Sequence, residues 1–387
     1  MKEAIRLAFR NLWGAGIRTW LNAGVLAFSL IIVIFFTGLI DGWNEESRRE
    51  GIAWEYAEGH LYHKDFDLLD AFTYLDGHGV LPQEEQVGLT PVLFRSITLY
   101  PQGRMVSALL KGIPTDQNVV KLPTASLDTV INGIPVMVGS RMADLLKVEV
   151  GDEIMMRWRD KYGAYDAQTV TIVKVFDCIV PGVDGGQIWM SLDKMAELTA
   201  MQGEASYFLA DEDFDENSFK NDDWKYSDKE VLLKPMTDVI NTKKSSGVFL
   251  YMLFLGIGLL AIFDTQVLSI FRRQKEIGTY IALGMTRWQV VRIFTFEGVM
   301  YSFFAVILAA VFGTPLLWLI AKVGYPMPGD ASDYGMIMSN VIYPVYGLGL
   351  VVKSALSLMI FATLISFLPA RKITKLNPIL ALKGKAF

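Results

Sequence analysis

Four apolar stretches constrain this chain most strongly, because each is long enough to cross a lipid bilayer as a helix. A hydrocarbon core about 30 Å thick requires roughly 20 apolar residues in a helix. The predicted spans are residues 19–41, 246–271, 290–321 and 345–369. They exclude an ordinary soluble protein, while a charged fraction of 20% excludes a chain that lies wholly in lipid.

Charge is divided unevenly between residues 42–245 and the rest of the chain. That segment carries 34 acidic and 20 basic side chains, whereas the rest carries 7 and 16. Most of these 16 flank the spans on one side: Lys2, Arg6, Arg10, Arg18, Arg272, Arg273, Lys275, Arg287, Arg292, Arg371, Lys372, Lys375, Lys383 and Lys385. Because cytoplasmic flanks are enriched in Lys and Arg, we expect both termini inside and residues 42–245 outside.

The predicted fold class is an α-helical membrane protein with four transmembrane helices and an α+β extracytoplasmic domain inserted between the first and second. Pro315 is expected to kink the third span. The segments between the spans are an amphipathic cytoplasmic helix (1–18), the external domain with its stalk (42–245), a short cytoplasmic helix (272–289), a short external loop (322–344) and a cytoplasmic tail (370–387). Within the external domain we expect a helical extension at 43–58, strands from 60 and at 92–100, 105–111, 153–158, 169–176 and 187–191, and helices at 141–146 and 192–201.

Residues able to form a metal or catalytic site are few. His60 and His63 are three apart, so on a strand they face opposite sides and do not converge on a metal. Residues 211–215 match the start of a calcium loop, but position six is Glu216 rather than Gly, which favours a solvated acidic loop. Cys178 is the only cysteine and is expected to be buried. The chain also lacks a P-loop motif. We therefore expect no metal, no cofactor and no catalysis in this chain.

The short segment after the second span carries an amphipathic pattern. Ile277, Tyr280, Ile281 and Gly284 recur at helical spacing beside charged residues. One interpretation is a loop that only fixes topology. Contact with a partner explains more, because small residues allow another surface to approach closely: Gly278, Ala282 and Gly284.

Several motifs together resemble FtsX/MacB-type permeases of the type VII ABC transporter superfamily. They are Arg272-Arg273-x-x-Glu276-Ile277-Gly278 with Ala282-Leu283-Gly284, Glu297-Gly298, and the closing Pro369-Ala370-Arg371-Lys372, Asn377-Pro378 and Ala381-Leu382. The resemblance implies a permease dimer, with a second copy or a homologue, that works with a separate cytoplasmic ATPase dimer by mechanotransmission. ATP and magnesium would be bound by that ATPase. The implied coupling helix contains Arg272, Arg273, Lys275, Glu276, Ile277, Gly278, Ala282, Leu283 and Gly284.

The external domain is closest in pattern to lipoprotein-releasing (LolC/LolE-type) permeases, through residues 138–152 and 183–193. This favours release of lipoproteins from the outer leaflet of a bacterial inner membrane. A short predicted turn near residues 159–167 puts direct capture of a periplasmic chaperone in doubt. The alternatives are MacB-like efflux of a peptide, drug or lipid with an adaptor, and an FtsX-like scaffold that regulates cell-wall hydrolases. No nucleic-acid partner is expected.

A substrate groove between the first and second spans of opposing subunits is a further hypothesis, with Leu26, Leu30, Ile34 and Phe35 of the first span as its lining. Ordinary packing against neighbouring helices explains the same residues. A helix that is apolar on all sides has no polar face to show which side is buried.

Two charges inside the predicted spans form another hypothesis. Asp264 and Lys353 lie at similar expected depths and could pair. The alternative is that each reaches the interface or bonds a polar neighbour such as Thr265.

Overall fold

The computed structural model describes residues 17–67, 70–131, 133–328 and 335–375. They form two compact units. The helical unit comprises the described residues of 1–43, 240–326 and 341–387, and the sheet unit comprises those of 44–239 and 327–340. Most of the predicted amphipathic helix and of the predicted tail therefore falls outside the described residues.

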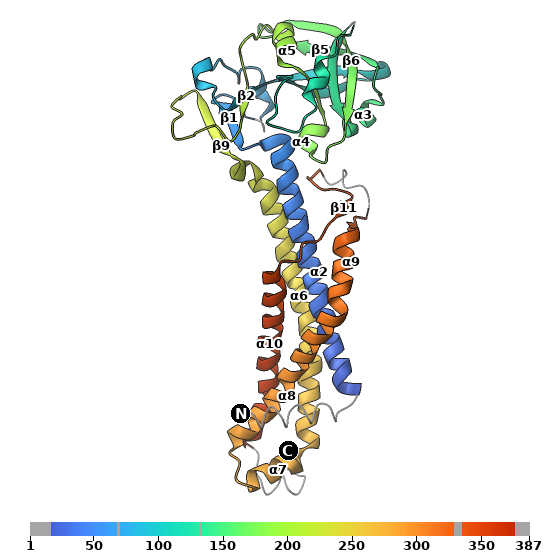
Figure 1. Ribbon diagram of the computed structural model, residues 1–387, viewed down its shortest axis with the longest axis vertical. Coiled ribbons are helices and arrows are strands. Elements are labelled where there is room, and N and C mark those ends of the chain that lie inside the picture. The colour runs from blue at the N-terminus through green and yellow to red at the C-terminus, as the bar shows by residue number, and fades with distance from the viewer. Residues whose placement is uncertain (1–16, 68–69, 132, 329–334, 376–387) are drawn as a thin grey trace. The chain divides into compact units, whose positions relative to one another are not determined.

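Long apolar helices build the helical unit (Figure 1). They are α2 (Ile17–Gly51), α6 (Lys229–Arg272), α7 (Gln274–Ala282), α8 (Arg287–Leu308), α9 (Thr314–Val323) and α10 (Leu348–Ala370), which ends in a 3-10 turn at Arg371–Lys375. Residues 44–51 of α2 and 229–239 of α6 belong to the sheet unit. A two-stranded ladder pairs β10 (Tyr325–Pro326) with β11 (Val341–Ile342). Among the described residues, four helical segments are long and apolar enough to cross a membrane. The four expected apolar helices are thus confirmed, although α6 begins well before residue 246.

The third apolar segment changes its geometry beside Pro315. A π-helical turn at Ala309–Gly313 joins α8 to α9. Proline has no N–H to donate to the preceding turn of the helix. The disturbance expected at Pro315 therefore takes the form of a wider turn just before it.

The core of the helical unit consists of apolar and small side chains. Leu26 on α2, Leu259 on α6 and Ala362 on α10 belong to one buried cluster. A Cβ atom at Gly298 on α8 would collide with the Ser366 side chain on α10. Small residues let membrane helices approach closely, so Gly298 permits the tight packing of α8 on α10.

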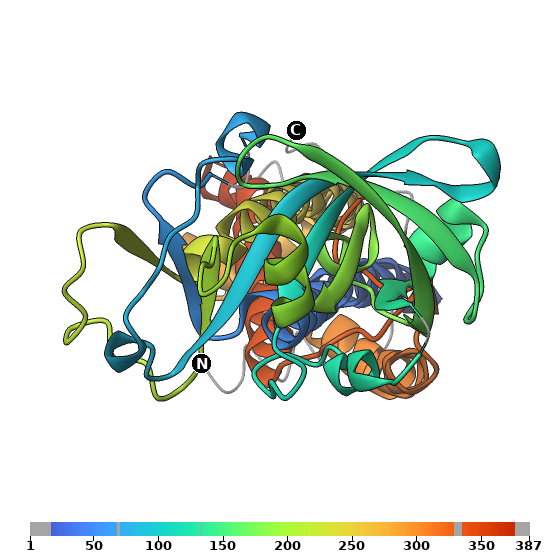
Figure 2. The same ribbon diagram turned by 90° about the horizontal axis from the view of Figure 1, so that it is seen from above.

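In the described residues of the sheet unit, nine strands form one sheet, accompanied by three short α-helices. Figure 2 shows the curved sheet from above. The strands are β1 (Gly59–His63), β2 (Leu89–Tyr100), β3 (Val106–Ile113), β4 (Ile134–Gly139), β5 (Glu153–Arg159), β6 (Tyr165–Phe176), β7 (Gln187–Ser191), β8 (Tyr207–Ala210) and β9 (Trp224–Asp228). The helices are α3 (Ser140–Leu146), α4 (Pro181–Asp184) and α5 (Leu192–Thr199). The strands expected between residues 92 and 191 are confirmed, whereas β4, β8 and β9 were not predicted.

Six of these strands close into a barrel. The sheet runs β3-β7-β4-β6-β5-β2, and β2 also pairs with β3. Along β5, Ile154, Met156 and Trp158 are buried and the intervening residues are exposed, as expected for a strand with one face toward a core. From β2 the sheet continues outward through β8, β1 and β9.

Residues 327–328 and 335–340, which lie within the predicted external loop 322–344, contribute to the sheet unit. Ile337 is buried in one of its apolar clusters. The Ser47 hydroxyl donates to the Ile337 carbonyl at 2.7 Å, and the Ser339 hydroxyl donates to the Glu46 carboxylate at 2.9 Å. The segment is therefore a structural part of that unit.

Candidate functional site

The helix α7 and the turns on either side of it form the most distinctive feature at the end of the helical unit where α6 ends and α8 begins (Figure 1). A left-handed glycine, Gly284 with a φ of 97°, follows α7. The next helix begins with a capping box, in which Thr286 and Gln289 bond each other's backbone N–H groups. These signals fix α7 as a separate short element between two long helices.

One face of α7 is packed against the helical unit. Ile277 is fully buried in a cluster with Val290 and Phe294 of α8 and with Ala370 at the end of α10. Gly278 is buried on the same side. The closeness that Gly278 allows is therefore used inside the chain rather than for another surface.

An ion-pair chain joins the start of α7 to the interior of α8. The Arg273 guanidinium contacts Glu276 at 2.7 Å and Glu297 at 2.9 Å. It also lies 4.8 Å from the centroid of the Phe294 ring. Glu297 is only 5% exposed, so Arg273 supplies the charge that a buried carboxylate needs.

The opposite face of α7 is exposed. Leu283, just after the helix, is 79% exposed, which is unusual for so large an apolar side chain. The exposed residues among those predicted for coupling are Arg272, Lys275, Glu276, Ala282, Leu283 and Gly284. Arg273, Ile277 and Gly278 face inward, so the nine residues divide into an exposed face and a face packed on the helical unit.

The residues of the groove hypothesis lie in the core instead. Leu26, Leu30 and Ile34 are at most 5% exposed, packed among the other helices of the unit. Phe35 is half-buried, with its ring 5.5 Å from that of Tyr325. These contacts are within one chain, and the groove between opposing subunits stays a prediction.

An apolar crevice does lie between α2 and α6, on other residues. Phe36 and Ile40 of α2 and Val248 and Phe254 of α6 are among its lining residues. Lys244, which also lines it, pairs with Asp41 at 2.6 Å.

The hypothesis that Asp264 pairs with Lys353 receives no support from the structure. Both side chains are exposed, on α6 and α10, and no ion pair joins them within the described residues. The neighbouring Thr265 accepts instead from the Asn22 amide of α2 at 2.7 Å.

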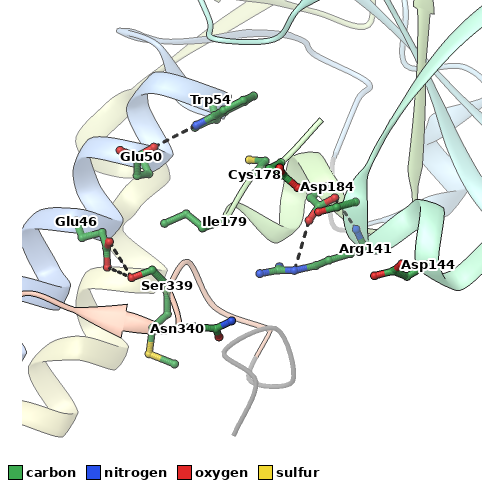
Figure 3. Close-up of a pocket in the computed structure, with 13 residues that line it drawn as sticks. Glu46, Glu50, Trp54, Arg141, Asp144, Cys178, Ile179, Asp184, Ser339 and Asn340 are labelled. Atoms are coloured by element: carbon green, nitrogen blue, oxygen red, sulfur yellow. Dashed lines mark hydrogen bonds and ion pairs between the residues drawn. The ribbon is translucent and has the colours of Figure 1, made fainter. Parts of the chain in front are cut away.

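In the sheet unit, an acidic pocket of about 530 Å³ lies beside α3 and α4 (Figure 3). Asp184 is fully buried, accepts from the Arg141 backbone N–H at 3.0 Å and lies 3.4 Å from the Arg141 Nε. Burial raises the pKa of the Asp184 carboxyl to about 6. The other carboxylates of the lining are Glu46, Glu50, Asp144 and Asp177. Sequence reasoning missed this pocket, because residues far apart in the chain build it.

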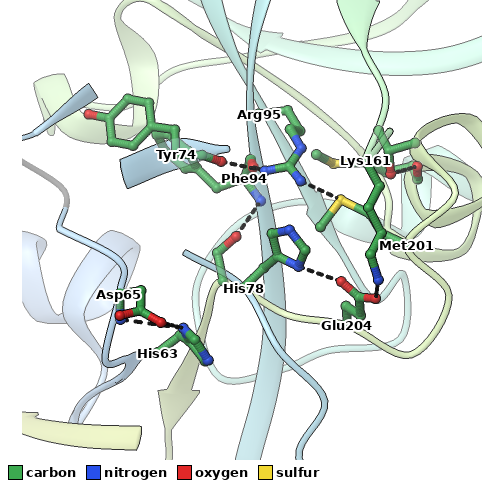
Figure 4. Close-up of polar contacts among 12 residues, drawn as sticks. His63, Asp65, Tyr74, His78, Phe94, Arg95, Lys161, Met201 and Glu204 are labelled. Carbon is green, nitrogen blue, oxygen red and sulfur yellow. Dashed lines mark hydrogen bonds and ion pairs between the residues drawn. The ribbon is translucent and has the colours of Figure 1, made fainter. Parts of the chain in front are cut away.

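A buried polar cluster holds the loop after β1 against the barrel (Figure 4). Arg95 on β2 is 1% exposed and bonds the Tyr74 carbonyl and the Met201 sulfur. Glu204 pairs with both His78 and Lys161. Burial, together with the Arg95 charge, lowers the pKa of His78. These contacts give the cluster a structural role, because they join the loop after β1 to the barrel.

The candidate metal ligands have other partners. His60 is buried, with its ring nitrogens 2.6 Å from the Tyr62 hydroxyl and 2.9 Å from the Glu55 carbonyl. Asp211 and Asp215 accept from nearby backbone N–H groups in an exposed loop. Across the described residues, no group of three His, Cys, Asp or Glu side chains is placed to hold a metal ion.

Comparison with known proteins gives two similarities. Residues 248–378, from within α6 to beyond α10, match the family model of the FtsX-like permease C-terminal domain. The chain is also 27% identical over 172 residues to an uncharacterized ABC transporter permease of Methanocaldococcus jannaschii. That alignment covers 43% of this chain and 40% of the relative, so the chain spans well under half of the relative it matches.

These similarities agree with the architecture of the helical unit. Four apolar helices and an FtsX-like permease domain indicate a membrane protein. Together with the archaeal relative, they support the FtsX-like ABC permease family.

Proposed function

We propose that this chain is the permease subunit of an ABC transporter and is driven by a separate cytoplasmic ATPase through α7. The observation that carries the proposal is the division of α7 into two faces. Lys275, Glu276 and Leu283 are exposed for docking. Arg273 and Ile277 fix the same helix to the unit behind it.

This arrangement transmits displacement to the membrane helices. A push on the exposed face of α7 reaches α8 through Ile277, which packs on Val290, and through Arg273, which is paired with Glu297. A packed apolar contact and a buried ion pair yield little, so α7 and α8 move together. The chain would work as a dimer with a second permease, since the ATPase partners are themselves dimeric.

The proposed location is the inner membrane, with both termini cytoplasmic and the sheet unit outside. The basic residues beside α7 and at the end of α10 support this orientation by the positive-inside rule. The docking face of α7 then lies in the cytoplasm, where an ATPase can reach it.

The substrate class we favour is a lipid-anchored protein released from the outer leaflet. The resemblance of residues 138–152 and 183–193 to lipoprotein-releasing permeases supports it. The apolar crevice between α2 and α6 has a volume of only about 70 Å³. The strands β5 and β6 are joined by a short turn at residues 160–164. We therefore do not propose that this turn captures a periplasmic chaperone.

Co-purification from native membranes tests the coupling face. Leu283→Asp combined with Glu276→Lys should reduce recovery of an ABC ATPase at least tenfold, because it removes the exposed apolar contact and reverses a charge. The matched control is Leu145→Asp, which changes an exposed leucine of α3. If the double variant retains the ATPase and its ATP hydrolysis as the control does, α7 is not the docking surface.

A further inference from the structure

A second crevice of the helical unit lies between α8 and α10, close to α7. It has a volume of about 270 Å³. Val291, Phe296 and Val299 of α8 and Phe367 of α10 form its apolar walls. The two helices pack closely on each other at Gly298 of α8 and Ser366 of α10.

The length of this crevice matches one leaflet of a bilayer. From Trp288 to Val299 the α8 axis rises about 16 Å, at 1.5 Å per residue. Half of a hydrocarbon core about 30 Å thick is nearly the same distance. One extended acyl chain therefore fits the crevice from the interface toward the bilayer centre.

The end of the crevice beside α7, at the start of α8, is basic and aromatic. Arg292 is exposed and has no ion-pair partner within the described residues. Trp288 stacks on Phe367, with ring centroids 6.4 Å apart, and tryptophan is enriched at the headgroup level of membranes.

Further positive charge follows at the end of α10. Arg371, Lys372 and Lys375 are exposed there, and residues 287–296 and 363–375 contain no Asp or Glu. A negative headgroup at this end therefore lies near the cations of α8 and α10, while Glu297, farther along α8, is already paired with Arg273.

We propose that the crevice binds one anionic glycerophospholipid of the adjacent leaflet. Its acyl chain lies against Val291, Val299 and Phe367, and its phosphate faces Arg292. The choice of a lipid rests on the length match and the charge complementarity, since basic pockets between membrane helices recognise such headgroups.

The position of the site gives the lipid a structural consequence. Val291, one of the crevice walls, is buried in the same cluster as Ile277 of α7. A bound chain therefore supports the side of α8 against which α7 packs. The site needs only that the helical unit lie in a bilayer, and it does not depend on the proposed transport function.

Quenching of tryptophan fluorescence by lipids with brominated chains tests the proposal. The full chain is reconstituted in phosphatidylcholine vesicles that contain brominated phosphatidylglycerol or brominated phosphatidylcholine. The difference in fluorescence quenching between the natural chain and Trp288→Phe gives the quenching of Trp288 alone. We expect an apparent affinity about fivefold higher for phosphatidylglycerol, which is the contribution of one basic residue near the membrane surface.

The preference for phosphatidylglycerol should disappear in Arg292→Gln and survive in Arg292→Lys. It should also survive in the control variant Lys322→Gln, because Lys322 is a basic residue of α9 outside the crevice. Equal quenching by the two lipids would show an ordinary lipid-facing surface. No quenching of Trp288 would show that protein, such as a second copy, fills the crevice. Either result overturns the proposal. Leu283→Asp should leave the preference unchanged, so failure of the lipid site and failure of ATPase docking are separable.

Discussion

Arg273 in the helical unit and Arg95 in the sheet unit are cations with different partners. In the helical unit, Arg273 and Glu297 form an ion pair between two elements, α7 and α8. The sheet unit also contains an ion pair, between Arg141 and the buried Asp184. Its buried cations, however, contact carbonyl, sulfur and aromatic groups: Arg95 bonds the Tyr74 carbonyl, and the Lys111 Nζ lies 4.9 Å from the centroid of the Trp189 ring. The difference suggests that the first contact links moving parts, whereas the second kind fixes loops and strands in one rigid body.

Removing the guanidinium from the ion pair should have the largest effect. Arg273→Ala leaves the Glu297 carboxylate buried without its partner, which typically costs about 3–5 kcal/mol. We expect a lower melting temperature in detergent and loss of the stimulation of ATP hydrolysis by substrate. Adding Glu297→Gln should restore part of the stability but not the coupling.

The same substitution in the sheet unit sharpens the comparison. Arg95→Ala should lower stability and leave the recovery of the ATPase with the chain unchanged. If Arg95→Ala uncouples ATP hydrolysis as strongly as Arg273→Ala does, the distinction between the two kinds of buried charge is wrong.

Acidification should weaken the sheet unit through His60. Its pKa is lowered to about 4 because burial disfavours the cation. The unfolded chain therefore takes up the proton first, and stability that is present above about pH 6.5 is lost as the pH falls toward 4. The loss amounts to about 3 kcal/mol.

Asp184 opposes this trend, because its pKa is raised in the folded state and protonation below about pH 6 favours folding. The His60 effect is therefore measured as the difference in unfolding free energy between the natural chain and His60→Gln at pH 7 and pH 4. A difference that does not change with pH would contradict it.

Packing of α8 on α10 should show the smallest effect. Gly298→Val places side-chain atoms where Ser366 lies, and overpacking of this kind costs about 1–3 kcal/mol. The double variant with Ser366→Gly should regain most of the lost melting temperature. Failure of this rescue would show that the clash is not with Ser366.

The sequence was sufficient to predict those elements that local patterns determine. Apolar length located the four helices, and alternation located β5, where Trp158 and its neighbours two residues apart are buried. The sequence identified the glycines among the predicted coupling residues, but not the direction in which each faces. Gly278 faces inward because α7 is fixed by Ile277, a contact with residues of α8 and α10.

Features that depend on distant residues were not predictable. Leu26 and Leu30 belong to a helix that is apolar on all sides, so the sequence alone could not show that they face the core. Barrel closure depends on the pairing of β2 with β3 and of β3 with β7, and β7 is far along the chain. The acidic pocket likewise combines Glu46 with Asp184 and Ser339.

Site-specific photo-crosslinking at Leu283 tests the central claim most directly. A benzophenone amino acid at residue 283 should give a covalent adduct with an ABC ATPase in native membranes, identified by mass spectrometry. The same group at Leu319, an exposed leucine of α9, should give none. Absence of an ATPase adduct at residue 283, or an equal yield at residue 319, would contradict the proposal that α7 carries the docking face.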